Sequence, residues 1–252
     1  MSQRHDAPAR VLIVGATSAI AGETAKEFAK NGAHLFLIGR NAGHLAAVAD
    51  DLRVRGAARV ETTILDVADL STQGLVIESA FATLGEVDVV LVAHGTLPDQ
   101  EHCQERVEET VKALQINFTG TIALLTLLAN RLQFQRHGCL AVIGSVAGSR
   151  GRRTNYVYGA AKGGVEIFLQ GLRSRLFQCN VTVLTIKPGF VDTPMTAGLK
   201  KNLLFADAGR IGRGIHRAIV RRKDVVYLPW FWRPIMGLLN SLPESVLKRL
   251  PI

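Results

Sequence analysis

The sequence predicts one α/β domain in which helices cover both faces of a parallel sheet of about seven strands. Short β-branched apolar runs recur along the 252 residues, and helical stretches separate most of them. A strand that is apolar throughout is buried on both faces, and strand–helix alternation indicates parallel pairing. Hydrophobic residues make up 48% of the chain, which is enough for one large core. The expected fold class is therefore a doubly wound sheet in a single domain.

The predicted elements follow one another from residue 11 to residue 228. The expected strands are Val11–Val14, His34–Ile38, Val60–Leu65, Val87–Val92, Leu140–Ile143, Val181–Ile186 and Val225–Leu228. The expected helices are Ile20–Lys30, Ala42–Val54, Thr72–Thr83, Arg106–Leu132 and Ala160–Phe177. Since no internal repeat or Pro/Ser-rich linker interrupts this pattern, residues 1–228 are assigned to one catalytic domain.

Residues 229–252 have a different character and form a predicted amphipathic, aromatic tail. They hold both Trp residues of the chain, and the basic residues Arg233, Lys248 and Arg249 lie near the aromatic ones. Interfacial segments combine Trp, Leu and base in this way, so the tail is expected to pack on the domain, to make a dimer contact or to lie on a membrane surface. No apolar stretch reaches the roughly 20 residues that a spanning helix needs, and the polar start of the chain argues against a signal peptide.

The charge balance is strongly basic, with 30 Lys and Arg against 21 Asp and Glu and a net charge of +9. Such an excess fits nucleic acid, an anionic membrane or a phosphorylated substrate. Part of it is a stripe at helical spacing, which is either a membrane-facing surface or a solvated one: Arg210, Arg213, Arg217 and Arg221. The three Cys residues lie far apart, which predicts no disulfide, no metal site and a reducing, cytoplasmic compartment.

A small-residue turn follows the first strand and reads Gly15-Ala16-Thr17-Ser18-Ala19-Ile20-Ala21. Such a turn lets the backbone and the positive helix N-terminus hold a pyrophosphate, although an ordinary strand–helix turn is the alternative. Arg40 ends the second strand, where an Arg accommodates the 2′-phosphate of NADP(H); NAD(H) remains possible. Asp66 ends the third strand and either binds the adenine amino group or caps the next turn. These features predict a Rossmann-type dinucleotide site.

A possible catalytic group lies around the fifth strand and the helix that follows it. Ser145 comes directly after that strand, and Tyr158 and Lys162 are four residues apart, so they share one helix face. A free Tyr has a pKa of about 10, and a nearby cation lowers this pKa by favouring the phenolate. The pair is therefore predicted to move a proton near neutral pH.

In these features the sequence resembles the classical short-chain dehydrogenase/reductase family. The resemblance covers essentially the whole chain and rests on seven motifs in register: the Gly15 turn, Asp66, Ala93-His94-Gly95, Asn117, Ser145, Tyr158-x-x-x-Lys162, and Pro188-Gly189 with Thr193. It implies hydride exchange between a nicotinamide and a carbonyl or alcohol carbon. It also implies a homo-oligomer, since the family is usually dimeric or tetrameric.

The resemblance implies a role for each matching residue. Tyr158 is the expected general acid, Ser145 polarises the substrate oxygen, Lys162 lowers the pKa of Tyr158 and binds the nicotinamide ribose, and Asn117 holds a relaying water. His94 is expected to support its strand rather than to catalyse. The expected cofactor contacts are Gly15, Thr17, Ser18, Ile20, Arg40, Asp66, Val67, Ala93, Gly95, Tyr158, Lys162, Pro188, Gly189, Val191 and Thr193.

The loop before Tyr158 carries three arginines, Arg150, Arg152 and Arg153, which are predicted to bind a substrate phosphate; a solvated basic loop is the alternative. This loop and the chain's ending are similar to the decaprenylphosphoryl-2-keto-ribose reductases. That resemblance implies a polyprenyl-phosphate-linked keto sugar, a flavin oxidase partner that supplies it, and action at the cytoplasmic membrane face.

Two alternatives to this function stay open. The first is a reductase of apolar ketones such as 3-oxoacyl or steroid-like substrates, which would not depend on the loop arginines. The second is a non-catalytic nucleotide-binding or nucleic-acid-binding protein on a reductase scaffold. The intact set of Ser145, Tyr158, Lys162 and Asn117 argues against the second, and nucleic acid is not an expected partner.

Overall fold

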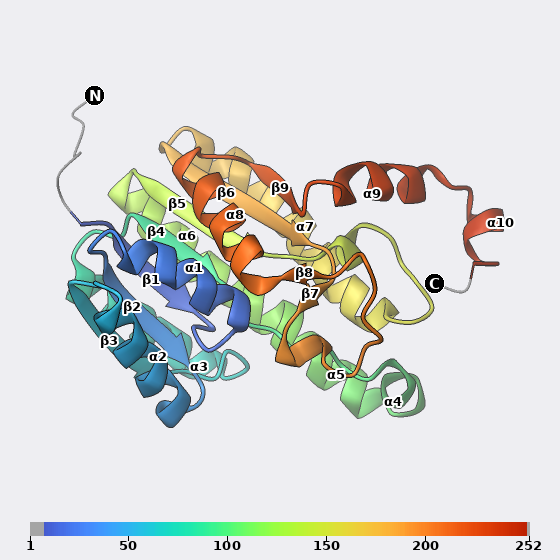
Figure 1. The fold of residues 1–252 in the computed structure, drawn as a ribbon, viewed down its shortest axis with the longest axis horizontal. Helices are drawn as coiled ribbons and strands as arrows, with labels where there is room; N and C mark the ends of the chain where they lie inside the picture. Colours follow the sequence, from blue (N-terminus) through green and yellow to red (C-terminus); the bar gives the residue numbers. More distant parts are fainter. Residues whose placement is uncertain (1–7, 251–252) are drawn as a thin grey trace.

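The computed structural model describes residues 8–250 and contains the predicted sheet (Figure 1). Its seven strands run in the order β3-β2-β1-β4-β5-β6-β9, and every neighbouring pair is parallel. The strands are β1 (Arg10–Val14), β2 (His34–Gly39), β3 (Arg59–Ile64), β4 (Val89–Val92), β5 (Gly138–Ile143), β6 (Val181–Pro188) and β9 (Val225–Leu228). The predicted fold class is confirmed, and so are all seven predicted strands. Residues 1–7 and 251–252 lie outside the described residues. They include the first residue of the predicted catalytic domain, the last residue of the predicted tail and most of the polar start of the chain.

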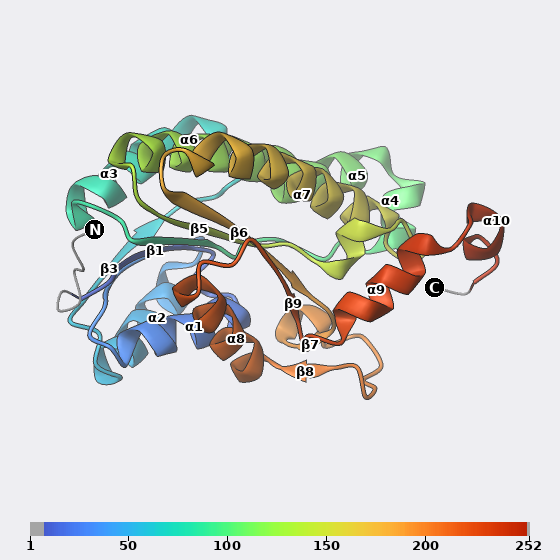
Figure 2. The same ribbon diagram turned by 90° about the horizontal axis from the view of Figure 1, so that it is seen from above.

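Helices cover both faces of the sheet, as Figure 2 shows. One layer contains α1 (Ala19–Ala29), α2 (Ala42–Val54) and α8 (Ala208–Val220); the other contains α3 (Leu70–Leu84), α6 (Gly120–Gln135) and α7 (Tyr156–Phe177). Successive strand residues point to opposite faces, so Val11 and Ile13 join the core under the first layer while Leu12 and Val14 join the core under the second. Two buried cores explain why the strands are apolar throughout.

The predicted helix Arg106–Leu132 is confirmed as one helical run, Val107–Gln135, which contains a π-helical turn. The chain forms α5 (Val107–Leu114), a π-helical turn η1 (Gln115–Thr119) and then α6. Gly120 packs so closely on the Val67 carbonyl that an added Cβ would lie 2.2 Å from its oxygen. Contrary to the expectation from the sequence, the helical stretch Val107–Gln135 is long and apolar enough to cross a membrane, but Leu124 and Leu128 are fully buried in the core beneath α6. Its apolarity is thus that of a core helix.

Several short elements were not predicted, and most of them lie near the carboxyl ends of the strands. They are α4 (Gln100–Glu105), η2 (Val146–Ser149), η3 (Pro194–Thr196), and a two-stranded sheet of β7 (Val191–Asp192) and β8 (Ala206–Asp207). The tail forms α9 (Trp232–Ser241) and α10 (Glu244–Leu247), which project beyond the end of the sheet (Figures 1 and 2). Trp232 and Met236 are buried against Val146, so α9 shares a small core with the catalytic domain.

Candidate active site

A continuous crevice lies at the carboxyl ends of the central strands. It consists of two adjoining cavities, one of about 230 Å³ beside β1, β2 and β4 and one of about 140 Å³ beside β5, β6 and α7. The two cavities share wall residues: Ser18, Ile20, Ala93, His94, Gly95, Thr193 and Met195. The strand order reverses between β1 and β4, and ligands of open α/β sheets bind at such a switch point.

The larger cavity has the features of a dinucleotide cradle. Gly15 has φ +82°, and a Cβ on it would lie 2.5 Å from the His94 amide nitrogen, so this position requires glycine. Ser18 precedes α1 without capping it through its side chain, so its hydroxyl is not used by the helix. The predicted residues that line this cavity are Gly15, Thr17, Ser18, Ile20, Arg40, Val67, Ala93, Gly95 and Thr193. The residues present therefore fit a dinucleotide.

Asp66 stands outside the lining of both cavities. Its side chain is exposed, and Oδ1 accepts a hydrogen bond from the Ala68 amide at 3.0 Å. This contact is the turn-capping role that the sequence left open, and the contact of Asp66 with adenine stays a prediction.

The smaller cavity brings together the predicted catalytic residues Ser145, Tyr158 and Lys162. Lys162 Nζ lies 5.8 Å from the centroid of the Tyr158 ring and donates a hydrogen bond to the Ile143 carbonyl at 3.0 Å. The Ser145 hydroxyl accepts from the Ala147 amide at 3.1 Å. The remaining predicted residues in this wall are Pro188, Gly189, Val191 and Thr193.

The fourth predicted catalytic residue, Asn117, reaches the site through the π-helical turn. Its side chain is buried, accepts from the Thr96 amide at 2.9 Å and donates to the Ala113 carbonyl at 3.0 Å. A Cβ on Gly95 would lie 2.9 Å from Asn117 Oδ1 and 3.5 Å from Lys162 Nζ, so both side chains approach the same point. The turn η1 thereby places Asn117 beside Lys162.

Burial dominates the electrostatics of the catalytic pair. It raises the pKa of Tyr158 to about 12, while the Ser145 hydroxyl acts in the opposite direction. Burial also lowers the pKa of Lys162 to about 8. The Lys162 ammonium, 5.8 Å from the centre of the ring, is not among the groups that shift this pKa, and the predicted lowering of the Tyr158 pKa by Lys162 stays a prediction. Tyr158 is a neutral phenol at neutral pH, which is the form that can donate a proton to a carbonyl oxygen.

The His94 ring lies in the wall shared by the two cavities and is neutral at neutral pH. Burial lowers its pKa to about 3, and the charges of Lys162 and Arg40 act in the same direction. Its Nε2 lies 2.9 Å from Thr121 Oγ1, on the first turn of α6. The neutral His94 ring connects the end of β4 to the start of α6. This contact is consistent with the expectation that His94 supports its strand.

The three loop arginines have different surroundings. Arg150 Nη2 donates to the Leu242 carbonyl at 3.0 Å and lies 2.9 Å from Glu244 Oε2, so this residue holds the tail. Arg152 lines the smaller cavity, and burial lowers its pKa. Its Nε is buried without a hydrogen-bond partner among residues 8–250. Arg153 is exposed to solvent. Of the three, Arg152 alone lines the smaller cavity, and the predicted contact of these arginines with a substrate phosphate stays a prediction.

Two kinds of wall residue were missing from the sequence prediction. Asn155 lines the smaller cavity, and its buried Oδ1 has no partner in the described part of the chain. The apolar wall residues were also missed: Leu97, Val146, Phe190, Met195 and Leu199. Asn155 lies three residues before Tyr158 and could have been found from that spacing, whereas the apolar residues come from four separate segments and carry no shared signal.

Comparison with known proteins gives a consistent result. Residues 9–204 match the family model described as short chain dehydrogenase. The chain is 38% identical over 243 residues to an uncharacterised oxidoreductase of Mycobacterium tuberculosis, covering 96% of this chain and 97% of that protein. It is 33% identical over 246 residues to an uncharacterised oxidoreductase of Streptomyces coelicolor, covering 97% of each.

Among solved structures, the fold resembles a short-chain dehydrogenase from Sphingobium yanoikuyae in complex with NADPH. The TM-score is 0.80 at 24% sequence identity, and the match covers 94% of this chain and 97% of that chain. The names of these relatives specify no substrate, so the similarity to decaprenylphosphoryl-2-keto-ribose reductases stays a prediction.

Proposed function

The chain belongs to the short-chain dehydrogenase family and is an oxidoreductase of that family, and from this premise we propose that it uses NADPH to reduce a keto group on a substrate that carries a phosphate. The observation that carries the substrate proposal is Arg152, a guanidinium in the cavity wall beside the catalytic residues with no anion next to it among residues 8–250. Arg152 is partly buried, and a buried guanidinium nitrogen that lacks a hydrogen-bond partner is costly unless a ligand supplies the acceptor.

The larger cavity supports a nicotinamide dinucleotide, which supplies a hydride when bound. Arg40 lines this cavity at the end of β2, where an arginine accommodates the 2′-phosphate of NADP(H). The fold neighbour in complex with NADPH agrees with this preference. NAD(H) would lack the anion that Arg40 matches, and we therefore expect a lower KM for NADPH than for NADH.

The side chains of the smaller cavity have the chemistry that ketone reduction requires. We assign the proton that the carbonyl oxygen receives to the neutral Tyr158 phenol, and the polarisation of that oxygen to the Ser145 hydroxyl. The Lys162 ammonium and the Asn117 amide meet behind Gly95, on the route by which a proton could return to Tyr158. Lys162 is also the assigned partner of the nicotinamide ribose.

Arg152 and Asn155 form the polar part of the substrate wall. A guanidinium binds phosphate with two parallel hydrogen bonds, and the side-chain amide of Asn155 can orient a neighbouring sugar hydroxyl. Apart from these two residues, the catalytic residues and a few small polar ones, the wall consists mainly of apolar side chains, among them Leu97, Phe190 and Leu199. This mixture suits a phosphate-linked keto sugar attached to a lipid, which is the substrate implied by the subgroup resemblance, with a flavin oxidase as the enzyme that would supply the ketone.

The apolar wall also favours a second candidate. Leu97, Phe190 and Leu199 could bind the chain of a 3-oxoacyl thioester or a steroid-like ketone without any contribution from Arg152. In that case Arg152 would form part of the cavity wall and would not bind a substrate phosphate. The two candidates differ in what the loss of Arg152 should do.

The test compares a ketose phosphate with the same ketose lacking its phosphate. We expect Arg152→Met to lower kcat/KM for the phosphorylated ketose by roughly 10- to 100-fold, as for the loss of a charged hydrogen bond, and to leave the other ketose within about twofold. Arg153→Met is the matched control, because it removes the same charge from the exposed neighbour. An equal loss for both ketoses, or a strong preference for a 3-oxoacyl thioester that survives Arg152→Met, would overturn the phosphate assignment.

A further inference from the structure

The projecting tail exposes two large apolar side chains, one just before α9 and one on it. Trp230 and Leu238 are 71% and 67% exposed, while the inner residues Trp232 and Met236 are buried against the domain. Three further apolar side chains at the sides of the helix are half-buried: Phe231, Ile235 and Leu239. We call the exposed set, Trp230, Leu238 and Val246 with Arg233, Lys248 and Arg249, the tail face. It lies on the part of the molecule that extends farthest from the sheet (Figures 1 and 2).

The charge of the tail face has one sign. Arg233, Lys248 and Arg249 are exposed, and Glu244 is the single acidic residue of the sequence after residue 228. Glu244 is already paired with Arg150 at 2.9 Å. The tail face therefore presents large apolar side chains together with positive charge that has no acidic partner among residues 8–250.

We propose that the tail face is a docking surface for an anionic lipid bilayer. Exposed Trp and Leu insert at the boundary of headgroups and acyl chains, and Lys and Arg beside them are attracted to anionic headgroups. A second copy of the chain fits this face poorly. Two copies of this face would bring surfaces of the same charge together, and the chain already has a net charge of +9.

The docking surface lies close to the substrate cavity. The buried side of α9 packs on the cavity wall, where the ring of Trp232 meets that of Phe190 at 5.5 Å between centroids. A helix is roughly 10 Å across, so the bilayer would be about one helix width from the cavity. This inference goes beyond the proposed reduction and does not depend on its substrate, since vesicle binding is measured without turnover.

The experiment is co-sedimentation of the full-length protein with vesicles of phosphatidylcholine, alone or with about 30% phosphatidylglycerol. We expect binding to the anionic vesicles that weakens as salt is raised, and at least a tenfold lower partition coefficient for the double variant Trp230→Ser, Leu238→Ser. The matched control is Val54→Ser, Leu75→Ser, which removes apolar side chains that are 88% and 77% exposed on α2 and α3. This control should bind like the unchanged protein.

Each other outcome overturns the proposal. These outcomes are absence of binding by the unchanged protein, equal binding to both kinds of vesicle, and an equal loss in the control variant. Light scattering provides the remaining test: if the Trp230→Ser, Leu238→Ser variant loses self-association and keeps vesicle binding, the face is a contact between copies. Trp230 and Leu238 line neither cavity, so turnover in solution should be unchanged and reports that the double variant is folded.

Discussion

At the scale of single residues, the site holds two groups whose pKa values are shifted in opposite directions by the same cause. Loss of solvent raises the pKa of Tyr158 to about 12 and lowers that of Lys162 to about 8. Since burial disfavours the charged form of each group, the phenol is neutral and the ammonium is only marginally stable as a cation. The charge of Lys162 is thus the feature of the site most easily changed by pH.

This difference predicts how activity depends on pH. Because Lys162 is protonated below a pKa of about 8, kcat/KM for NADPH should be constant on the acidic side and fall as the pH rises through about 8. His94, with a pKa of about 3, and Tyr158, with a pKa of about 12, change charge outside the range from pH 6 to pH 10. The measurement is the initial rate at varied NADPH and saturating ketone.

The control for this prediction is Lys162→Arg, whose guanidinium stays charged throughout the range. Its rate should be lower at every pH, but the decline near pH 8 should be absent. A profile of the unchanged enzyme that stays level up to pH 10 would show that the charge of Lys162 is not needed for capture of the cofactor.

The sequence was sufficient for residues whose partners are local. Tyr158 and Lys162 are one helical turn apart, so their meeting followed from spacing alone. Arg150 could not be interpreted in that way, because its partner Glu244 lies 94 residues further along the chain. The sequence therefore gave no way to distinguish Arg150, Arg152 and Arg153, although only Arg152 lines the cavity.

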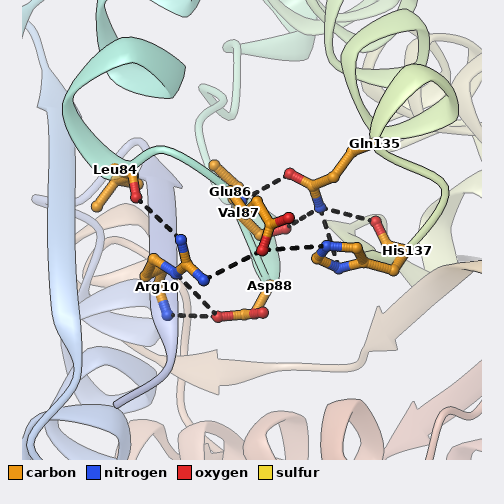
Figure 3. A network of polar contacts seen from close by, with 7 residues as sticks. All are labelled: Arg10, Leu84, Glu86, Val87, Asp88, Gln135 and His137. Atoms are coloured by element: carbon orange, nitrogen blue, oxygen red, sulfur yellow. Dashed lines mark hydrogen bonds and ion pairs between the residues drawn. The ribbon is translucent and has the colours of Figure 1, made fainter. Parts of the chain in front are cut away.

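At the scale of elements, one glutamine closes the end of the sheet opposite the crevice. The Gln135 side chain accepts from the Val87 amide and donates to the Val87 carbonyl, both at 2.8 Å, just before β4 begins (Figure 3). The same amide donates to the His137 carbonyl at 2.9 Å. Arg10 joins this region to β1 through Glu86 and Asp88. The end of α6 is thus tied to the start of the sheet.

Replacement of Gln135 should therefore reduce stability without affecting catalysis. Val87 is fully buried, so Gln135→Leu leaves its amide and carbonyl without partners. Each unsatisfied group costs about 1–3 kcal/mol, and we expect a loss of about 2–4 kcal/mol in the free energy of unfolding by urea. Gln133→Leu, on the same helix, loses exposed contacts with Arg175 and should cost less than about 1 kcal/mol. A similar loss in both variants would contradict this account.

The elements that could be predicted were those with a strong period. The central strands are apolar on two faces, which distinguishes them from their surroundings, and the edge strands β3 and β9 were found as well. The π-helical turn was missed because one extra residue changes the helical pattern too little to detect. Asn117 could be named from its motif, but its position beside Lys162 depends on that turn.

At the scale of the whole molecule, the net charge of +9 is divided among several places. Arg40 and Arg152 face the two cavities, and Arg150 holds the tail. The stripe of α8 is exposed along its length, which leaves solvation and attraction to an anionic surface as its two interpretations: Arg210, Arg213, Arg217 and Arg221. Composition alone could not divide the charge in this way, because burial and pairing depend on contacts between distant segments.

The division of the chain at residue 228 also leads to a test, since the tail and the domain share a core. Trp232 is 3% exposed, and its indole lies on Gly189, where an added Cβ would be 1.8 Å from Nε1. Trp232→Ala should lower the free energy of unfolding by about 3–5 kcal/mol, as for other buried aromatic residues. Because Gly189 and Phe190 line the substrate cavity, KM for the ketone should rise more than KM for NADPH.

The control is Trp230→Ala, at a site 71% exposed, which should change the free energy of unfolding by less than about 0.5 kcal/mol. If both variants were equally stable, the tail would not share a core with the domain. A loss of stability confined to Trp232→Ala would show the shared core, and a rise in KM for the ketone in the same variant would make the tail part of the support of the substrate cavity.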